Sequence, residues 1–307
     1  VIDGEGSAWT ITNYLHVGSA GTGELTITNN GLVSAESFSV NESSSITVDV
    51  GNGSSIMAGT NDDDWTGTIR NNGTIYLAAG ADAVPGIYTP MSYGEMNGSG
   101  IVQALGGVWD EFARTITVAD AVAAQGQGGA SADLDLSVNQ RVRITDTGSG
   151  KSAGVGFSGT DSSTAITLTA AAVGKDDLDS LESLLAGTDE EILSTWDLSA
   201  QGSKVSTDNP VYLSLSASSA KSLSGLTIWR LTDGQWTGYE PSGLGFDGTY
   251  AGFVADSLGV YAVTAAVDNS CPADLDQDGD VDGLDLFSLL STENEITTQA
   301  FSSFFGR

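Results

Sequence analysis

Six aspartates crowd into a short stretch near the C-terminal end of the chain, within CPADLDQDGDVDGLDLFSLL at residues 271–290. Carboxylate oxygens are hard ligands, and no Cys or His lies between these residues, so the chemistry that they favour is the binding of calcium and not of zinc or copper. The six predicted calcium ligands are Asp274, Asp276, Asp278, Asp280, Asp282 and Asp285.

The spacing of these residues matches a calcium loop of the EF-hand kind. If Asp274 is position 1, side-chain oxygens fall at positions 3, 5 and 12, and Gly279 falls at position 6, where the loop turns sharply. Asp280 then contributes its backbone carbonyl at position 7, and Asp282 acts through water at position 9. The alternative is a solvated acidic run, which needs no such register. Position 12 is Asp285, where most such loops have Glu.

This stretch resembles the calcium-binding repeat of dockerins, in which Asp is usual at the twelfth position and the helix before the loop is missing. It is most similar to the C-terminal half-dockerin segments of secreted bacterial proteins, because Cys271 precedes the loop and FSSFFGR closes the chain at 301–307. The resemblance implies a cohesin-like partner. A second repeat would have Leu289 and Ala300 at its first and last ligand positions, so we expect that half to bind no metal.

Composition narrows the classes of partner. The chain has 307 residues, with 10 Lys and Arg against 40 Asp and Glu, and its formal net charge is −30. A charge of this sign argues against nucleic acid and anionic membranes as partners. No apolar run is long enough for a membrane span. The sequence begins at Val1 and not at Met, so we expect that a signal peptide has been removed or lies outside this segment. The protein is then expected to be extracellular or on the cell surface, where millimolar calcium would keep a weak site loaded.

The N-terminal third contains an imperfect repeat. ELTITNNGLVSA (24–35) and GTIRNNGTIYLA (67–78) share a strand, an Asn-Asn-Gly turn and a second strand. SITVDVGNGSSIMA lies between them, with Ile46 placed 19 residues after Ile27 and 23 before Ile69. A period near 20 is typical of one coil of a β-solenoid, and Asn and Gly tolerate the positive φ angles that its corners need. We therefore predict a β-solenoid-like domain over 1–109.

Alternating apolar residues indicate which side chains point into this solenoid. The stretch also resembles the Gly-rich repeats of autotransporter-type and exosortase-sorted surface proteins. The alternative is an antiparallel meander, and finding Ile27 and Ile69 in separate sheets on opposite faces of a sandwich would argue for it. The predicted inward-facing residues are Leu25, Ile27, Ile46, Val48, Ile69 and Ile75.

The middle of the chain predicts a β-sandwich over 110–268, followed by the calcium module at 269–307. Strand-like segments recur around Leu134, Val142, Val155, Ile166 and Val211, and Asp233-Gly234 predicts a hairpin turn. One helical patch is predicted within 174–198, where leucines recur at a spacing of three to four residues. The segment 226–265 resembles the β-sandwich module that precedes the sorting tail of exosortase-dependent (PEP-CTERM) surface proteins. The fold class is thus mainly β, with one short helix and a small EF-hand-like module.

No constellation of catalytic residues stands out, so we expect a protein that is not an enzyme. His16 is the single histidine, and no Ser or Cys has a recognisable His–acid partner set. Six tryptophans could form a platform for sugar stacking, although aromatic residues in strands more often belong to a core.

Three classes of function are compatible with these observations. The first is a structural surface or matrix protein that assembles as a homo-oligomer or polymer into a filament or sheath, with junctions stabilised by calcium. It is favoured by the first strand, around Trp9, Ile11 and Leu15, which has no proline and few charges to protect its edge. The second is an adhesin or a carbohydrate-binding protein with a polysaccharide partner. The third is a dockerin-bearing component of a polysaccharide-degrading system.

Overall fold

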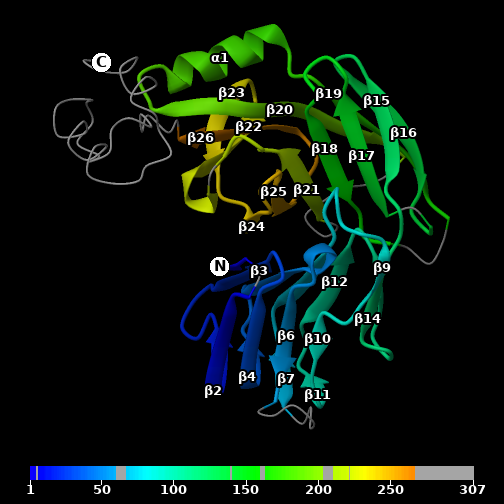
Figure 1. The fold of residues 1–307 in the computed structure, drawn as a ribbon, viewed down its shortest axis with the longest axis vertical. Helices are drawn as coiled ribbons and strands as arrows, with labels where there is room; N and C mark the ends of the chain where they lie inside the picture. Colours follow the sequence, from blue (N-terminus) through cyan, green and yellow to red (C-terminus); the bar gives the residue numbers. More distant parts are fainter. Residues whose placement is uncertain are drawn as a thin grey trace, which may run out of the picture. The chain divides into compact units, whose positions relative to one another are not determined.

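Figure 1 shows the fold in a computed structural model, which describes residues 1–4, 6–59, 67–138, 140–159, 163–202, 210–220 and 222–266. The described chain is mainly β, as predicted, and its α-helix is α1 (Lys175–Leu185). The predicted calcium module at 269–307 lies outside the described residues.

Two parallel sheets form the N-terminal part. The first sheet has the order β1 (Ile2–Asp3), β3 (Glu24–Thr28), β5 (Ser45–Asp49), β8 (Thr74–Ala78) and β12 (Ile101–Leu105). In the second, β2 (Ala8–Val17) pairs with β4 (Leu32–Val40), which pairs in turn with β6 (Ser55–Ala58) and β7 (Thr68–Asn71); β10 (Met91–Ser92) and β11 (Glu95–Asn97) follow. All of these pairings are parallel, so the chain winds as a β-solenoid and not as an antiparallel meander.

The six residues predicted to face inward are all buried, but they do not all stack in one sheet. Ile46 stacks between Leu25 and Ile75 in the first sheet, and Ile27 stacks on Val48. Ile69 belongs to the second sheet, where it stacks on Phe38 of β4. Ile27 and Ile69 therefore do lie in separate sheets, contrary to our expectation. The two sheets are successive faces of the same coil, and the parallel pairing identifies the solenoid.

The corners confirm the role assigned to asparagine and glycine. Asn29 and Asn30 both adopt positive φ, at 51° and 64°. Gly73, at the corresponding corner of a later coil, has no room for a side chain, because a Cβ there would lie 2.2 Å from the carbonyl oxygen of Ser44 in the neighbouring coil. Short polar residues and glycine thus allow the coils to stack closely.

A small antiparallel sheet covers the last coil. It has the order β13 (Val108–Asp110), β14 (Thr115–Val118) and β9 (Gly86–Tyr88). Ile116 and Val118 of β14 are buried in the solenoid core, and Trp109 packs against that core. Ile116 and Val118 lie beyond position 109, where we predicted the solenoid to end, and the next strand, β15 (Val122–Gly126), belongs to the second half of the chain.

Two six-stranded sheets form the second half and share one core. The first has the order β15, β17 (Arg141–Asp146), β18 (Ser152–Gly156), β21 (Val211–Ser216), β25 (Tyr250–Ala255) and β24 (Ser242–Phe246). The second has the order β16 (Gly129–Asp135), β19 (Ala165–Ala171), β20 (Glu190–Gln201), β26 (Val260–Ala266), β22 (Leu226–Thr232) and β23 (Gln235–Tyr239). Side chains from both sheets, such as Ile144 and Leu213 from one and Leu168 and Val263 from the other, fill the shared core. This is the arrangement of a β-sandwich.

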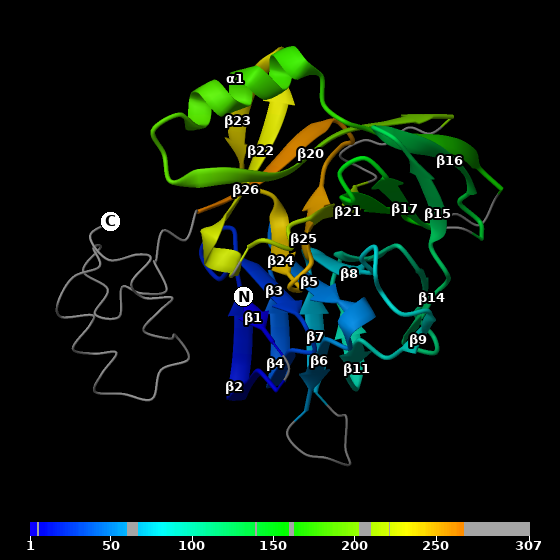
Figure 2. The ribbon, with the colours of Figure 1, turned by 45° about the horizontal axis from the view of Figure 1, so that its top comes forward.

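Helix α1 is shorter than the predicted helical patch. It ends at Leu185, and strand β20 (Glu190–Gln201) begins within the predicted helical patch, so residues 190–198 of that patch are strand. Leu181 and Leu185, one turn apart, are buried against Trp236 and Ala262 on the outer face of the second sheet. Figures 1 and 2 both show the helix beside β23 and β20. The short helix of the fold prediction is therefore present, but it covers only residues 175–185 of the predicted range.

Strands β22 and β23 form the hairpin predicted from Asp233-Gly234. Thr232 pairs with Gln235, so Asp233 and Gly234 alone make the turn. Both have positive φ, 52° for Asp233 and 75° for Gly234. These are the angles of a type I′ turn, which suits the twist of the flanking strands.

The solenoid and the sandwich are in close contact, and the chain from Val1 to Ala265 forms one unit. Strand β24 of the sandwich packs against β3 and β5 of the solenoid. Two of its glycines make this approach possible, because a Cβ on Gly243 would lie 2.4 Å from Thr47 and one on Gly245 would lie 2.5 Å from Thr28. Asn29 also donates a hydrogen bond to the carbonyl of Phe246.

No helix among the described residues is long and apolar enough to cross a membrane.

Candidate functional site

The predicted calcium ligands Asp274, Asp276, Asp278, Asp280, Asp282 and Asp285 lie outside the described residues, as do Cys271 and the second repeat. Within the described part of the chain, no group of three or more His, Cys, Asp or Glu side chains is placed to hold a metal ion. The calcium site therefore stays a prediction from the sequence.

Strand β2 is an open edge of the solenoid. It has ten residues, and its partner strand in the described structure is β4, with Trp9 opposite Val33 and Leu15 opposite Phe38. Successive peptide groups of a strand point to opposite sides, so about half of its backbone N–H and C=O groups face away from β4. Figure 1 shows β2 at the end of the row that β4, β6 and β7 continue.

The side chains of β2 show that the core is also left uncovered at this edge. Trp9, Val33, Ile56 and Met91 lie in register across four strands and form one inward-facing row. The last three are 0 or 1% exposed, whereas Trp9 is 41% exposed. Since Trp9 continues a buried row, its exposure marks the place where the next coil of a longer solenoid would lie.

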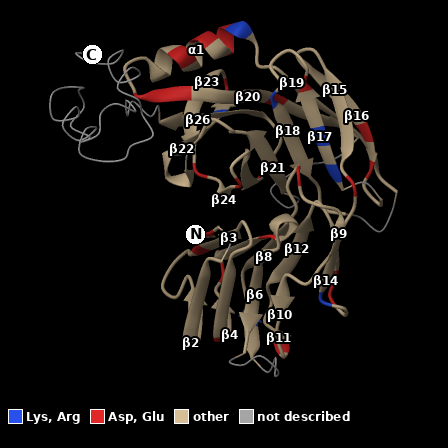
Figure 3. Ribbon diagram, in the orientation of Figure 1, with Lys and Arg blue, Asp and Glu red and all other residues tan. Residues whose placement is uncertain are grey.

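No charge protects this edge. No Lys, Arg, Asp or Glu occurs between Ala8 and Val17, and β2 is accordingly drawn without red or blue in Figure 3. Tyr14 is 63% exposed and stacks on His16, with 6.3 Å between the ring centroids. Proteins usually protect long edge strands with lysine, proline, a bulge or a covering segment. Here the described protection is one register irregularity between Ile11 and Tyr14.

The opposite end of the solenoid differs. There the core is closed by Ile116 and Val118, which are 0 and 2% exposed. The terminal strands β10, β11 and β12 have two, three and five residues, so each offers a shorter edge than β2. The two ends are thus unequal, and β2 is the longer unprotected edge.

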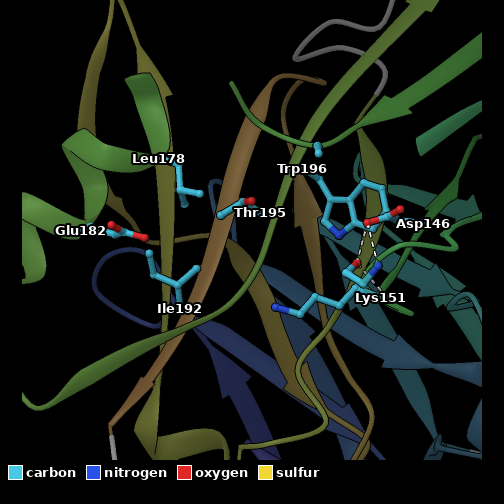
Figure 4. Close-up of a pocket in the computed structure, with 9 residues that line it drawn as sticks. Asp146, Lys151, Leu178, Glu182, Ile192, Thr195 and Trp196 are labelled. Atoms are coloured by element: carbon cyan, nitrogen blue, oxygen red, sulfur yellow. Dashed lines mark hydrogen bonds between the residues drawn. The ribbon is translucent and has the colours of Figure 1, made fainter. Parts of the chain in front are cut away.

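A second candidate is a pocket of about 270 Å³ in the sandwich, beside helix α1 (Figure 4). Leu178 and Glu182 of the helix and Ile192 of β20 line one side, and Lys151 and Trp196 line the other. Trp196 is 2% exposed, and its indole N–H has no hydrogen-bond partner among the residues that the structure describes. An unpaired buried donor is uncommon in folded proteins. The pocket therefore combines apolar walls with polar groups, as binding pockets for small ligands do.

Not every polar group in this pocket is available. The carboxylate of Asp146 accepts hydrogen bonds from the backbone amides of Gly128, Gly148 and Ser149 and from the Ser149 hydroxyl. These bonds favour the charged form and lower the pKa of Asp146 to about 2. Asp146 therefore holds its own turn together, and Lys151, Glu182 and Thr195 are the groups left for a ligand.

The other residues that the sequence suggested for catalysis or sugar binding lie far apart in the structure or have structural roles. His16 is exposed on β2. Trp229 donates a hydrogen bond to Thr264 and Trp236 donates one to the backbone of Asp177, so these two rings have structural roles. Trp65 lies outside the described residues, and the remaining tryptophans lie on different sheets. They do not form a common platform for a sugar.

The open edge was indicated by the sequence, whereas the pocket was not, since its residues come from three separated segments with no motif.

No family model matches the chain, and no curated protein matches it.

Proposed function

We propose that this is a non-enzymatic structural protein of the cell surface or extracellular matrix, which assembles with further copies of itself through strand β2. The single observation that carries the proposal is that a ten-residue strand without charged residues ends a buried core row at a half-exposed tryptophan. The calcium loop from Asp274 to Asp285 would then stabilise a second junction.

Strand addition is the chemistry that such an edge supports. A strand from a second molecule would pair with the free N–H and C=O groups of β2, and its side chains would cover Trp9 and Ile11. Each backbone hydrogen bond would contribute only about 1 kcal/mol net, so most of the specificity would come from the side chains. Because β2 carries no charge, a second copy of β2 could approach it without direct repulsion between the two strands.

The charge distribution favours a second copy of this chain as the partner that pairs with β2. A net charge of −30 opposes contact between copies, but the acidic residues lie elsewhere than on β2. Calcium would relieve the remaining repulsion, so assembly should strengthen as calcium is added.

Sedimentation velocity of the purified chain over a range of concentrations, with and without millimolar calcium, tests the proposal. We expect dimers or larger assemblies that weaken in the Trp9→Lys/Tyr14→Lys double variant. Phe112→Lys is the matched control, because Phe112 is fully exposed on a different part of the surface. A wild-type chain that stays monomeric in calcium, or a Phe112→Lys variant that loses assembly equally, would refute the role of β2.

A second candidate function, binding of a carbohydrate by a surface adhesin, is supported by the pocket at Trp196. Sugar hydroxyls both donate and accept hydrogen bonds, so they suit a wall with Lys151, Glu182 and Thr195. Calorimetric titration with cellohexaose would measure binding. Trp196→Phe keeps an aromatic ring and removes the N–H, so it should weaken binding if that donor takes part; absence of heat with the wild-type chain would exclude this ligand.

A further inference from the structure

Three carboxyl groups meet where the sandwich packs on the solenoid. Asp49 ends strand β5 of the solenoid, Asp82 follows β8, and Asp247 lies in the turn between β24 and β25 of the sandwich. All three line one small cavity of about 10 Å³, roughly the space of a single water molecule. Of the three, Asp49 is buried and Asp247 is partly buried, whereas Asp82 is exposed to solvent.

The hydrogen bonds show how little of this charge is compensated. Asp49 is 7% exposed and accepts bonds from the Gly51 amide at 3.2 Å and from the Asn52 side chain at 3.0 Å. Asp247 accepts bonds from the amides of Thr249 and Tyr250, at 2.7 and 2.6 Å. These four donors are neutral groups, which stabilise a negative charge less than a cation would.

Two of these carboxyls face each other across the junction, because Asp49 belongs to the solenoid half and Asp247 to the sandwich half. Both line the same cavity.

Apart from the aspartates, the titratable groups that line the cavity are two tyrosines, which carry no counter-charge. Tyr212 of β21 is 3% exposed, lines the same cavity and has no hydrogen bond from its hydroxyl to another described residue. Tyr250 lines the cavity as well. The guanidinium of Arg141 donates to the backbone carbonyls of Gly80, Ala83 and Ala119, and its charge acts on Asp82.

We propose that Asp49 and Asp247 form a proton-dependent lock between the solenoid and the sandwich, closed when both carboxyls hold protons and weakened when they ionise. Ionisation would place two negative charges around one small cavity, where the burial of Asp49 strengthens their repulsion. The repulsion acts across the junction, since Asp247 is on the sandwich side and Asp49 is on the solenoid side. The lock does not depend on self-assembly, because both residues belong to one chain.

The direction of the pH dependence follows from burial. Burial, assisted by the neighbouring carboxyls, raises the pKa of Asp49 to about 7, and burial is also the main reason that the pKa of Asp247 rises to about 6. In the unfolded chain both groups ionise near pH 3.8. The folded state therefore holds protons that the unfolded state has lost. Stability is fully present below pH 3.8 and falls as the pH rises, until Asp247 and then Asp49 have ionised.

The test is chemical denaturation of the full chain between pH 5 and pH 8.5. Each group should lower the folding equilibrium constant about tenfold per pH unit until its own folded-state pKa is passed. The fall should be steepest below pH 6, where both groups contribute, and should level off above pH 7. Hydrogen exchange, corrected for its intrinsic pH dependence, should show the amides of β24 losing protection first, because this strand lies at the junction.

The Asp49→Asn/Asp247→Asn double variant replaces both carboxyls by neutral groups of the same shape. It should show a much flatter pH dependence and should exceed the wild-type chain in stability at pH 8. Asp197→Asn, an exposed carboxyl on β20, is the control and should retain the wild-type slope. An unchanged slope in the double variant would overturn the lock.

A cation could in principle take the place of the protons, and the same variants distinguish this outcome. The measurement is repeated at pH 8 with 5 mM calcium in an Asp274→Ala background, which removes the predicted loop site. The lock predicts no gain in stability. A gain that is lost in the Asp49→Asn/Asp247→Asn variant would identify the cluster as a cation site, and the proton lock would be wrong.

Discussion

Arg141 offers the sharpest test of how the two halves of the chain are held together. Its side chain is 2% exposed, and it donates to the carbonyls of Gly80 at 2.8 Å, Ala83 at 3.0 Å and Ala119 at 3.2 Å. These carbonyls belong to the loop after β8 and to the segment between β14 and β15, whereas Arg141 begins β17 of the sandwich. One buried guanidinium therefore connects the sandwich to two segments of the solenoid half.

The expected cost of Arg141→Ala follows from these contacts. A buried acceptor that loses its donor costs about 1 to 3 kcal/mol. With three carbonyls affected, and with water able to enter the vacated space, we expect a loss near the lower bound, about 3 kcal/mol in the free energy of unfolding. Arg141→Lys should recover only part of it, because an ammonium group cannot match the planar fork of a guanidinium.

Guanidinium chloride denaturation, followed by tryptophan fluorescence and by circular dichroism, would measure the loss. Arg143→Ala is the matched control, since Arg143 lies two residues along the same strand and is exposed. It should change the free energy of unfolding by no more than about 0.5 kcal/mol. If Arg141→Ala and Arg143→Ala unfold at the same denaturant concentration, the carbonyl contacts contribute nothing and the reasoning fails.

Three further predictions concern single residues. Asp274→Ala should abolish calcium binding in calorimetry while Asp280→Ala is tolerated, because position 7 of the loop uses a backbone carbonyl; two equivalent sites in the wild-type titration would contradict a metal-free second repeat. Ile46→Ala should lower the free energy of unfolding by about 2 to 5 kcal/mol, since Ile46 is fully buried between Leu25 and Ile75, and a smaller loss in denaturant would mean that the coils repack. Gly234→Ala should cost about 1 kcal/mol, because its φ of 75° is strained for alanine although no atom lies within 4 Å of the new methyl group; a neutral result would refute this turn argument.

Local patterns predicted the strands and their turns well. Asparagine and glycine marked the solenoid corner at Asn29-Asn30 and the hairpin at Asp233-Gly234, because positive φ is a property of single residues. Alternation of apolar residues identified all six inward-facing positions of the solenoid, since the period of a strand fixes which face a side chain occupies. Information of this kind is contained within a few adjacent residues.

The register of the solenoid could not be predicted in the same way. Leu25, Ile46 and Ile75 stack directly, although the interval between the last two is longer than that between the first two. The extra residues include the segment 60–66 and strand β7, so a fixed period assigned Ile69 to the wrong sheet. Coils of unequal length conserve the stacking, not the spacing in sequence.

The prediction of a helix over 174–198 was wrong beyond residue 185 for a different reason. Residues 190–201 contain Ile192, Thr195 and Trp196, which favour a strand, but acidic residues and leucine at helical spacing precede them. In the folded chain this segment pairs with β19. Tertiary pairing therefore decided between two local preferences.

The carboxyl cluster could not be predicted from the sequence either, because Asp49, Asp82 and Asp247 come together only through the packing of the two halves.

The unequal ends of the solenoid restrict the kind of assembly that β2 can support. If β2 pairs with β2 of a second copy about a two-fold axis, both open edges are used and the complex closes as a dimer. A filament needs a second, different contact, and the opposite end of the solenoid offers only short strands below a closed core. The calcium module predicted at 269–307 is the remaining candidate for that contact. Calcium-dependent growth beyond the dimer would thus require both Asp274 and the open edge, whereas dimerisation would require the edge alone.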